Sequence, residues 1–268
     1  MQGDKEKITT IDYFKLGKAL GIGQFGQVWL AQHKKEHFVC AIKIINMSNI
    51  KENVQVKNIR REIEIHLNIV HKYIIQMYGY FYDSEKLYLV MEYCGENGDM
   101  FKLLRNRNSL EYNLVKKYIR QVAMAVEHLH RMDIIHRDIK PENILIDNDD
   151  NIKLCDFGWS VCNKDKRRGT FCGTLDYLSP EMCENKIYDK GVDVWCIGVL
   201  CYELICGDTP FDTSSKPTHV SKQIIIDQKI KYSSIFTREA RDFIEMCCEK
   251  DFAKRADIKM VLKHDFLQ

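Results

Sequence analysis

The spacing of hydrophobic residues divides the chain into a strand-rich part and a helix-rich part. Residues 13–45 are rich in β-type residues, and residues 73–82 and 87–92 alternate between apolar and polar positions, which is typical of strands. Residues 54–70, between these strands, predict a single helix. The first third of the chain is therefore expected to form a sheet accompanied by one helix.

Helical patterns dominate after the break at Gly95-Glu96-Asn97-Gly98. Residues 114–131 carry apolar residues at helical spacing, and residues 192–206 form the most apolar run. Asp193 and Glu203 interrupt that run, so it is too short and too polar to span a bilayer and predicts a buried helix. We expect a short N-terminal segment at 1–12, a small lobe at 13–94 and a mainly helical lobe at 95–268.

The composition is that of a folded protein with reduced thiols. A chain of 268 residues with 45% hydrophobic and 29% charged residues can bury a large core. The net charge of +2 gives no reason to expect direct binding of nucleic acid or a membrane, and residues 1–10 are too polar for a signal segment. The eleven cysteines follow no regular framework, so we expect thiols packed in the core of a cytosolic or nuclear protein.

The residues that suggest a chemistry lie in His136-Arg137-Asp138-Ile139-Lys140-Pro141-Glu142-Asn143 and in Asp156-Phe157-Gly158. Asp138 can accept the proton of a substrate hydroxyl, and Asn143 and Asp156 offer the hard oxygen ligands that Mg²⁺ prefers. Phosphoryl transfer needs these groups, because it depends on positioning and charge neutralisation. Asp-Phe-Gly alone is common in loops, but the three features at this spacing are specific.

A glycine-rich stretch, Gly21-Ile22-Gly23-Gln24-Phe25-Gly26, lies near the start of the chain. Its glycines allow a tight turn and let the backbone approach a phosphate. The same pattern marks dinucleotide-binding folds, where it joins a strand to a helix. Here Val28 and further β-type residues follow it, which favours a flap between two strands that covers ATP.

Lys43 is the one charged residue in the apolar run 38–45, and a lysine buried there needs a partner. The helix predicted at 54–70 should supply it. Glu62 shares a helix face with Ile65 and His66, whereas Glu64 points elsewhere. We therefore expect Lys43 to pair with Glu62; the alternative is that Glu62 is a solvated surface acid.

With these residues in place, the chain resembles the eukaryotic protein kinases over nearly its full length. Lys140, two positions after Asp138, resembles the serine/threonine-specific members. The segments 59–65, 78–81, 156–161 and 167–178 are similar to those of the Aurora branch. The resemblance implies an α+β protein kinase fold of two lobes, with an antiparallel sheet and one helix in the first, mainly helices in the second, and ATP between them.

The resemblance also implies roles for individual residues. Asp138 would be the catalytic base, Lys140 would steady the γ-phosphate, and Lys43, paired with Glu62, would hold the α- and β-phosphates. The expected ATP-binding residues are Gly21, Ile22, Gly23, Gln24, Phe25, Gly26, Val28, Ala41, Lys43, Met91, Glu92, Cys94 and Leu145. Asn143 and Asp156 would bind Mg²⁺, Thr170 would be a regulatory phosphosite, and Asp193 and the pair of Glu181 with Arg255 would brace the second lobe.

The chain departs from the Aurora pattern at several positions. Gly169 stands where a second threonine is usual, Ser179-Pro180-Glu181 replaces Ala-Pro-Glu, the segment after Glu92 is one residue longer, and the sequence is close to a bare catalytic domain. The resemblance nevertheless implies a role in chromosome segregation and in mitotic spindle or kinetochore control. It further implies an inner-centromere-type activating subunit and a place in the nucleus, on chromosomes, kinetochores and spindle, with the cytoplasm as an alternative.

Two carboxylates are expected to select the protein substrate. Glu142 and Asp99 would face the residues that precede the target hydroxyl, where basic side chains form charge-assisted hydrogen bonds. The chain's own Arg167-Arg168-Gly169-Thr170 fits such a preference. Substrates would then be histone-like or kinetochore proteins with basic residues before serine or threonine. The alternative for Asp99 is a capping role at the helix that starts near Met100.

Two other functions stay open on the sequence alone. Another basophilic kinase branch would keep every catalytic residue but act on other substrates. A pseudokinase would bind partners without chemistry, yet such proteins usually lack the strand lysine, the base or a metal ligand. Lys43, Asp138, Asn143 and Asp156 are all present, which favours an active enzyme.

Overall fold

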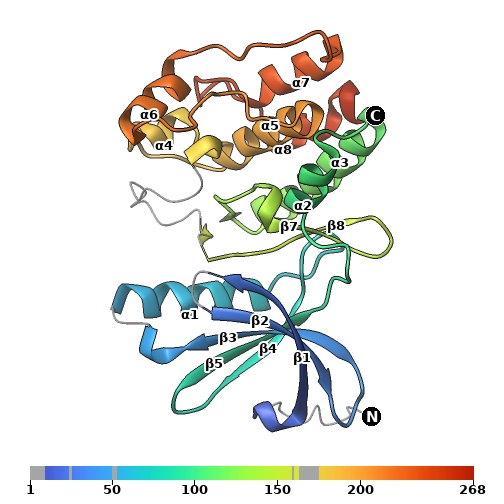
Figure 1. Cartoon of the computed structure of the whole chain (residues 1–268). Helices are drawn as coiled ribbons and strands as arrows, with labels where there is room; N and C mark the ends of the chain where they lie inside the picture. The colour runs from blue at the N-terminus through green and yellow to red at the C-terminus, as the bar shows by residue number, and fades with distance from the viewer. Residues whose placement is uncertain (1–9, 24–25, 50–52, 159, 163–174) are drawn as a thin grey trace. The chain divides into compact units, whose positions relative to one another are not determined.

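The chain folds into two compact units (Figure 1). One comprises Met1–Val70 with Ile75–Cys94, and the other comprises His71–Ile74 with Gly95–Gln268. The structure, a computed structural model, describes residues 10–23, 26–49, 53–158, 160–162 and 175–268. Gln24, Phe25 and Thr170, for which the sequence predicts roles, lie outside these ranges.

The first unit is an antiparallel five-stranded sheet with the order β1-β2-β3-β5-β4, and one long helix, α1, packs against it (Figure 1). Its elements are η1 (Ile11–Tyr13), β1 (Phe14–Gly23), β2 (Gly26–His33), β3 (Val39–Asn46), η2 (Met47–Asn49), α1 (Asn53–Leu67), β4 (Met77–Tyr82) and β5 (Lys86–Glu92). Alternation along β3 and β5 supplies two apolar clusters. One contains Ile42 and Val90, and the other joins Ile45 and Leu89 to Ile59 and Ile63 of α1.

The prediction of a strand over residues 73–82 is wrong for its first four residues. His71–Ile74 belongs to the second unit, where the backbone carbonyl of Tyr73 accepts a hydrogen bond of 2.9 Å from the N–H of Leu154. Ile74 also forms an isolated bridge with Leu154. Periodicity alone does not separate a strand from a short extended segment that pairs elsewhere.

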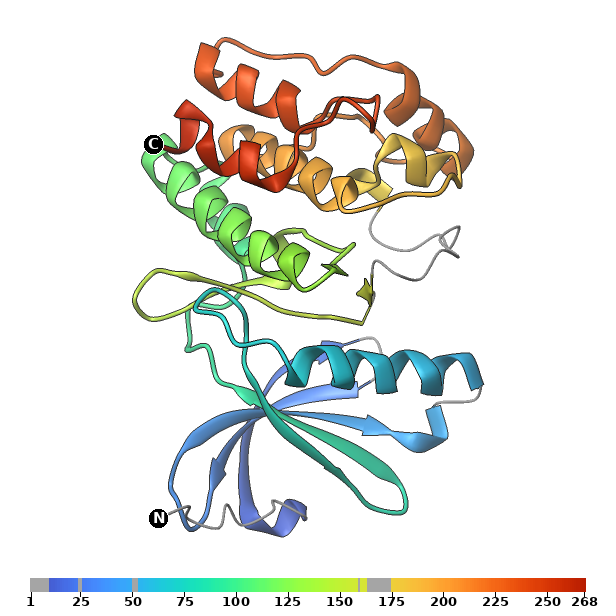
Figure 2. The same ribbon diagram turned by 180° about the vertical axis from the view of Figure 1, so that it is seen from behind.

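The second unit is mainly helical (Figure 2). Its helices are α2 (Met100–Arg107), α3 (Tyr112–Arg131), η3 (Pro141–Asn143), η4 (Leu175–Tyr177), α4 (Pro180–Cys183), α5 (Gly191–Cys206), α6 (Thr218–Asp227), α7 (Arg238–Cys247), α8 (Ile258–Lys263) and η5 (Asp265–Leu267). Four short strands form two pairs: β6 (Ile134–Ile135) with β9 (Val161–Cys162), and β7 (Ile144–Ile146) with β8 (Ile152–Leu154). The sheet and helices together make an α+β protein, as the sequence predicts.

Helix α5 is the centre of the second unit, in contact with α3, α7 and α8. It is the most apolar run of the sequence, and Trp195 and Leu200 within it are fully buried. Within the described ranges, no helix has both the length and the apolar character needed to cross a membrane. The cysteines whose side chains the structure describes are all free thiols, and most are buried.

A buried ion pair ties α4 to the segment that precedes α8. Arg255 donates to both carboxylate oxygens of Glu181, at 2.6 and 2.9 Å, and neither side chain is more than 2% exposed. The guanidinium also donates to the carbonyl of Gly191 at the start of α5 and lies over the ring of Trp195. Loss of one partner would leave a buried charge without compensation, at a cost of about 3–5 kcal/mol. The pair therefore stabilises the packing of α4, the start of α5 and the segment before α8 against one another.

Candidate active site

In the first unit, the sheet presents Lys43 to helix α1. Lys43 lies in β3 and pairs in register with Leu89 of β5. The Nζ atom of Lys43 is 3.2 Å from Oε1 of Glu62, and the two side chains are 12% and 5% exposed. The expected ion pair is therefore present, and Glu62 is not a solvated acid. Glu64 instead pairs with Arg60 on the exposed side of α1.

The glycine-rich stretch joins β1 to β2, as the sequence predicts. A Cβ atom at Gly26 would collide with the backbone carbonyl of Ile44, so only glycine lets β2 lie this close to β3. A Cβ atom at Gly21 would meet nothing within 4 Å, and Ile22 is 84% exposed. The end of β1 thus offers open backbone, whereas Gly26 serves the packing of the strands.

The other residues expected to contact adenine lie on adjacent strands of the same unit. Ala41 pairs with Met91, and Val28 pairs with Lys43. Glu92, at the end of β5, is anchored by Gln76: the two backbones exchange one hydrogen bond, and the Glu92 carboxylate accepts a second from the Gln76 N–H at 3.0 Å. Leu145 lies apart from them along the chain, in β7 of the second unit.

In the second unit, the loop between β6 and β7 is held by Asp193 of α5. This carboxylate accepts the backbone N–H groups of His136 at 3.0 Å and Arg137 at 2.8 Å, and lies 2.8 Å from Nε2 of His130. Burial would raise the pKa of Asp193, but the hydrogen bond and charge of His130 and the other donors outweigh it, so its pKa is below the usual value. A buried, ionised carboxylate therefore fixes the backbone just before Asp138.

The loop presents one oxygen of Asp138 without a partner. Oδ2 lies 3.0 Å from Nζ of Lys140 and accepts a 2.7 Å hydrogen bond from Nδ2 of Asn143. Oδ1 is buried and accepts no hydrogen bond from the described part of the chain. A buried carboxylate oxygen normally has a donor, so this atom is available to a hydroxyl group of a substrate.

Asn143 and Asp156 fit the requirements of a Mg²⁺ ion that also binds phosphates. The amide nitrogen of Asn143 is used on Asp138, which leaves its Oδ1. Asp156 is exposed and has a φ of 63°, and among the residues that the structure describes its one hydrogen bond is from the N–H of Gly158 to Oδ1. The described residues contain no cluster of three or more His, Cys, Asp or Glu side chains able to hold a metal by themselves. Two oxygen ligands suit Mg²⁺, which keeps waters and substrate oxygens in its shell.

Comparison with known proteins identifies the family to which the chain belongs. The model of the protein kinase domain matches residues 14–267. An Aurora kinase of Encephalitozoon cuniculi is 42% identical over 96% of this chain and 95% of its own length. An Aurora kinase of Saccharomyces cerevisiae is 44% identical over 96% and 70%, and Aurora kinase C of Mus musculus is 39% identical over 97% and 93%. This chain belongs to the Aurora family of protein kinases.

As an Aurora-family member the chain is a protein serine/threonine kinase, and the protein kinase domain implies that it uses ATP. The predictions of fold class, family and enzyme class are thus confirmed. The roles of the individual residues stay predictions, although the Lys43–Glu62 pair and the cluster around Asp138 have the geometry that this kinase activity needs.

The resemblance to the Aurora kinases implies that Thr170 is a regulatory phosphosite, and a phosphate there needs cationic partners. Thr170, Arg167 and Arg168 lie outside the described residues. Arg137 is described: its NH1 donates to the hydroxyl of Tyr188 at 2.6 Å, and Tyr188 is buried. Tyr188, which no motif of the sequence indicates, thus holds the side chain of the residue that directly precedes Asp138.

A second acidic residue, Glu203, interacts electrostatically with Glu142, which its place in the apolar run did not indicate. Glu203, in α5, accepts a short hydrogen bond from the hydroxyl of Tyr177. Burial raises the pKa of Glu203 to about 7; the Tyr177 hydrogen bond opposes this, and the negative charges of Glu142 and Asp176 add to it. In the sequence, Glu203 is only a polar interruption of an apolar helix. Its proximity to Glu142 depends on the tertiary fold.

Asp99 is the N-cap of α2. Its Oδ1 accepts the backbone N–H of Lys102 at 2.8 Å, and its Oδ2 lies 3.4 Å from Nζ of Lys102. The capping role that the sequence left open is therefore present. The cap uses Oδ1 and the ion pair with Lys102 uses Oδ2, which weakens the case for Asp99 as a substrate-binding group.

Proposed function

We propose that this Aurora-family kinase phosphorylates serine or threonine residues that follow basic residues, and that it acts on chromosomes and the spindle during mitosis. The observation that supports the substrate preference is the pair of carboxylates at Glu142 and Glu203. Glu142 is exposed within the loop of Asp138; burial raises the pKa of the half-buried Glu203, and the charge of Glu142 adds to that rise. Two carboxylates whose charges repel each other are stabilised by a cation that pairs with them.

The proposed chemistry uses residues of both units. Lys43, oriented by Glu62, holds the α- and β-phosphates of ATP, and Lys140 holds the γ-phosphate. Asn143 and Asp156 would hold Mg²⁺, which would supply the positive charge that neutralises the phosphates. The serine or threonine hydroxyl donates its proton to Oδ1 of Asp138 as its oxygen bonds to the γ-phosphorus and the bond to ADP breaks.

Asp138→Asn and Asp156→Asn are each expected to lower kcat by a factor on the order of a hundred or more, since one removes the base and the other a metal-ligand charge. Turnover of a peptide substrate, with circular dichroism to verify the fold, measures the effect. Asp149→Asn, at an exposed carboxylate in the β7–β8 turn, is the matched control. Near-normal rates in both variants would refute the assigned roles.

The preference for arginine is expected to increase with pH. At pH 6 Glu203, with a pKa of about 7, is mostly protonated and pairs poorly with a cation; at pH 8 it is ionised. The ratio of kcat/KM for peptides with arginine and with alanine two residues before the target should therefore rise from pH 6 to pH 8. One charge-assisted contact corresponds to about a tenfold ratio or more.

Glu203→Gln and Glu142→Gln separate the two carboxylates in the same assay. Glu203→Gln should lower the arginine preference at pH 8 and abolish its rise with pH. Glu142→Gln should also lower the preference, and because it removes a repulsive charge, the remaining rise should shift to lower pH. A preference that is absent in the native enzyme, or unchanged in Glu203→Gln, would contradict the pairing of arginine with these acids.

The proposed mitotic role includes an inner-centromere-type activating subunit that docks on the first unit. Strand β4 supports this, since it is an edge of the sheet and exposes Tyr78, Tyr80 and Tyr82, which are 51%, 47% and 70% exposed. Affinity purification from dividing cells should recover such a subunit, and its addition should raise kinase activity. Equal activity with and without it, at matched Thr170 phosphorylation, would argue against this partner.

A further inference from the structure

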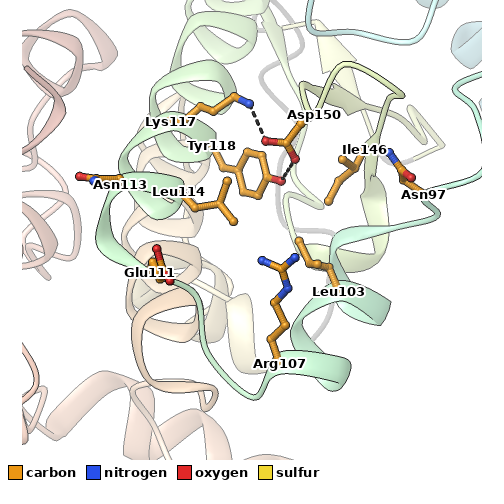
Figure 3. A pocket seen from close by; sticks show the side chains of 10 residues that line it. All are labelled: Asn97, Leu103, Arg107, Glu111, Asn113, Leu114, Lys117, Tyr118, Ile146 and Asp150. Atoms are coloured by element: carbon orange, nitrogen blue, oxygen red, sulfur yellow. Dashed lines mark hydrogen bonds and ion pairs between the residues drawn. The ribbon is translucent and has the colours of Figure 1, made fainter.

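The second unit contains a pocket that the kinase reaction does not use. It has a volume of about 630 Å³ and lies between α2, the start of α3 and the turn that joins β7 to β8 (Figure 3). None of the residues assigned to ATP, Mg²⁺ or the substrate hydroxyl lines it. The volume falls within the range of roughly 300–1,000 Å³ that is typical of ligand pockets.

The pocket is preformed by hydrogen bonds between its walls. Asp150, in the β7–β8 turn, accepts Nζ of Lys117 at 2.6 Å and the hydroxyl of Tyr118 at 2.5 Å, both from α3. Asn97 donates to the carbonyl of Asp147 at the base of the same turn. Burial raises the pKa of Asp150, but the hydrogen bonds from Lys117 and Tyr118 and the charges of Lys117 and Arg107 together lower the pKa by more. The carboxylate therefore stays ionised and bonded to Lys117 and Tyr118.

The lining combines an apolar surface with two cations, Arg107 and Lys117, and Lys117 is paired with Asp150. Leu103 of α2, Leu114 of α3 and the buried Ile146 of β7 supply the apolar part. Arg107, the last residue of α2, turns its guanidinium toward Leu103 and Tyr118 (Figure 3). It forms no hydrogen bond or ion pair within the described part of the chain. The nearby Asp150 is already bonded to Lys117 and Tyr118.

A simpler role for Arg107 is to complement the dipole of α2, because cations stabilise the C-terminal end of a helix. Arg105 lies in the same turn and serves that role equally, with its guanidinium over the ring of Phe101 on the helix surface. Only Arg107 faces the pocket. The other unbonded charge of the lining, Glu111, lies at the start of α3, away from the guanidinium (Figure 3).

We propose that this pocket is a docking site for an extended segment of a partner protein, which places an anionic side chain on Arg107 and a neighbouring apolar side chain on Leu103, Leu114 and Ile146. A planar guanidinium pairs well with either a carboxylate or a phosphate, so the anion is an acidic residue or a phosphorylated one. Docking here leaves the groups around Asp138 unoccupied, so a bound partner or substrate can be phosphorylated at a separate position.

Selection of peptides on the full chain tests the proposal without reliance on catalysis. A random library of short displayed peptides is selected against the protein with its nucleotide site filled by a non-hydrolysable ATP analogue. The enriched peptides should carry Asp or Glu beside Leu, Ile, Val or Phe. Fluorescein-labelled copies are then measured by anisotropy, with the acid changed to Gln, to Lys or to phosphoserine. The Gln and Lys peptides should bind at least about tenfold more weakly, and the phosphoserine peptide distinguishes the two anions.

Matched variants locate the site. Arg107→Glu should weaken binding at least about tenfold, whereas Arg105→Glu, two residues earlier in the same helix, should leave binding nearly unchanged. Leu103→Asn tests the apolar part independently and should also weaken binding. All three should phosphorylate a short peptide substrate as the native enzyme does. Enrichment of basic peptides only, of no peptide that depends on Arg107, or an equal effect of Arg105→Glu would overturn the proposal, whatever the substrate preference of the kinase.

Discussion

The geometry of the loop that carries Asp138 depends on one buried carboxylate. Asp193 is fully buried in α5 and receives the N–H groups of His136 and Arg137 and the Nε2 atom of His130. A buried ionised carboxylate is tolerated only when hydrogen-bonded donors replace its water, and here the donors come from the backbone before Asp138. The most apolar helix of the chain thus fixes the position of the loop that carries Asp138.

That anchor supports a backbone with local strain. Arg137 and Asp156 are not glycines, yet they have φ angles of 71° and 63°. Such conformations cost roughly 1–3 kcal/mol each and persist where the surroundings impose them. The N–H of Arg137 is held by Asp193, and the ring of Phe157, next to Asp156, packs on His136 at 5.1 Å between ring centroids. The loop and the Asp-Phe-Gly segment therefore support each other.

The sequence predicted what depends on short-range spacing. The helical period located α3 and α5, and the face shared by Glu62 and Ile65 distinguished Glu62 from Glu64 as the partner of Lys43. The strand prediction failed for residues 73–76, and for Tyr73 and Ile74 the reason is a long-range pairing with Leu154 that the sequence pattern does not show. Asp99 could be read as a cap or as a substrate group from sequence, and only the bond to Lys102 shows the cap.

Residues that act through tertiary proximity were missed. Glu203 and Glu142 are far apart in the sequence, and nothing in the helical pattern of α5 indicates that one of its acids lies near the loop of Asp138. The roles of Tyr188 and Arg107 could not be predicted from the sequence either, because a tyrosine and an arginine at the end of a helix have many ordinary roles. The hydrogen bond of Tyr188 with Arg137, and the position of Arg107 in a pocket, become visible only in the folded structure.

The Asp193→Asn variant tests the central claim, that this carboxylate positions the catalytic loop. An asparagine keeps the size but loses the charge and one acceptor. We expect the amides of His136 and Arg137 to exchange hydrogen faster, and kcat to fall on the order of a hundredfold, as a small misplacement of reacting groups would cause. The helices should be retained by circular dichroism. Native exchange at both amides with native kcat in the folded variant would contradict the account.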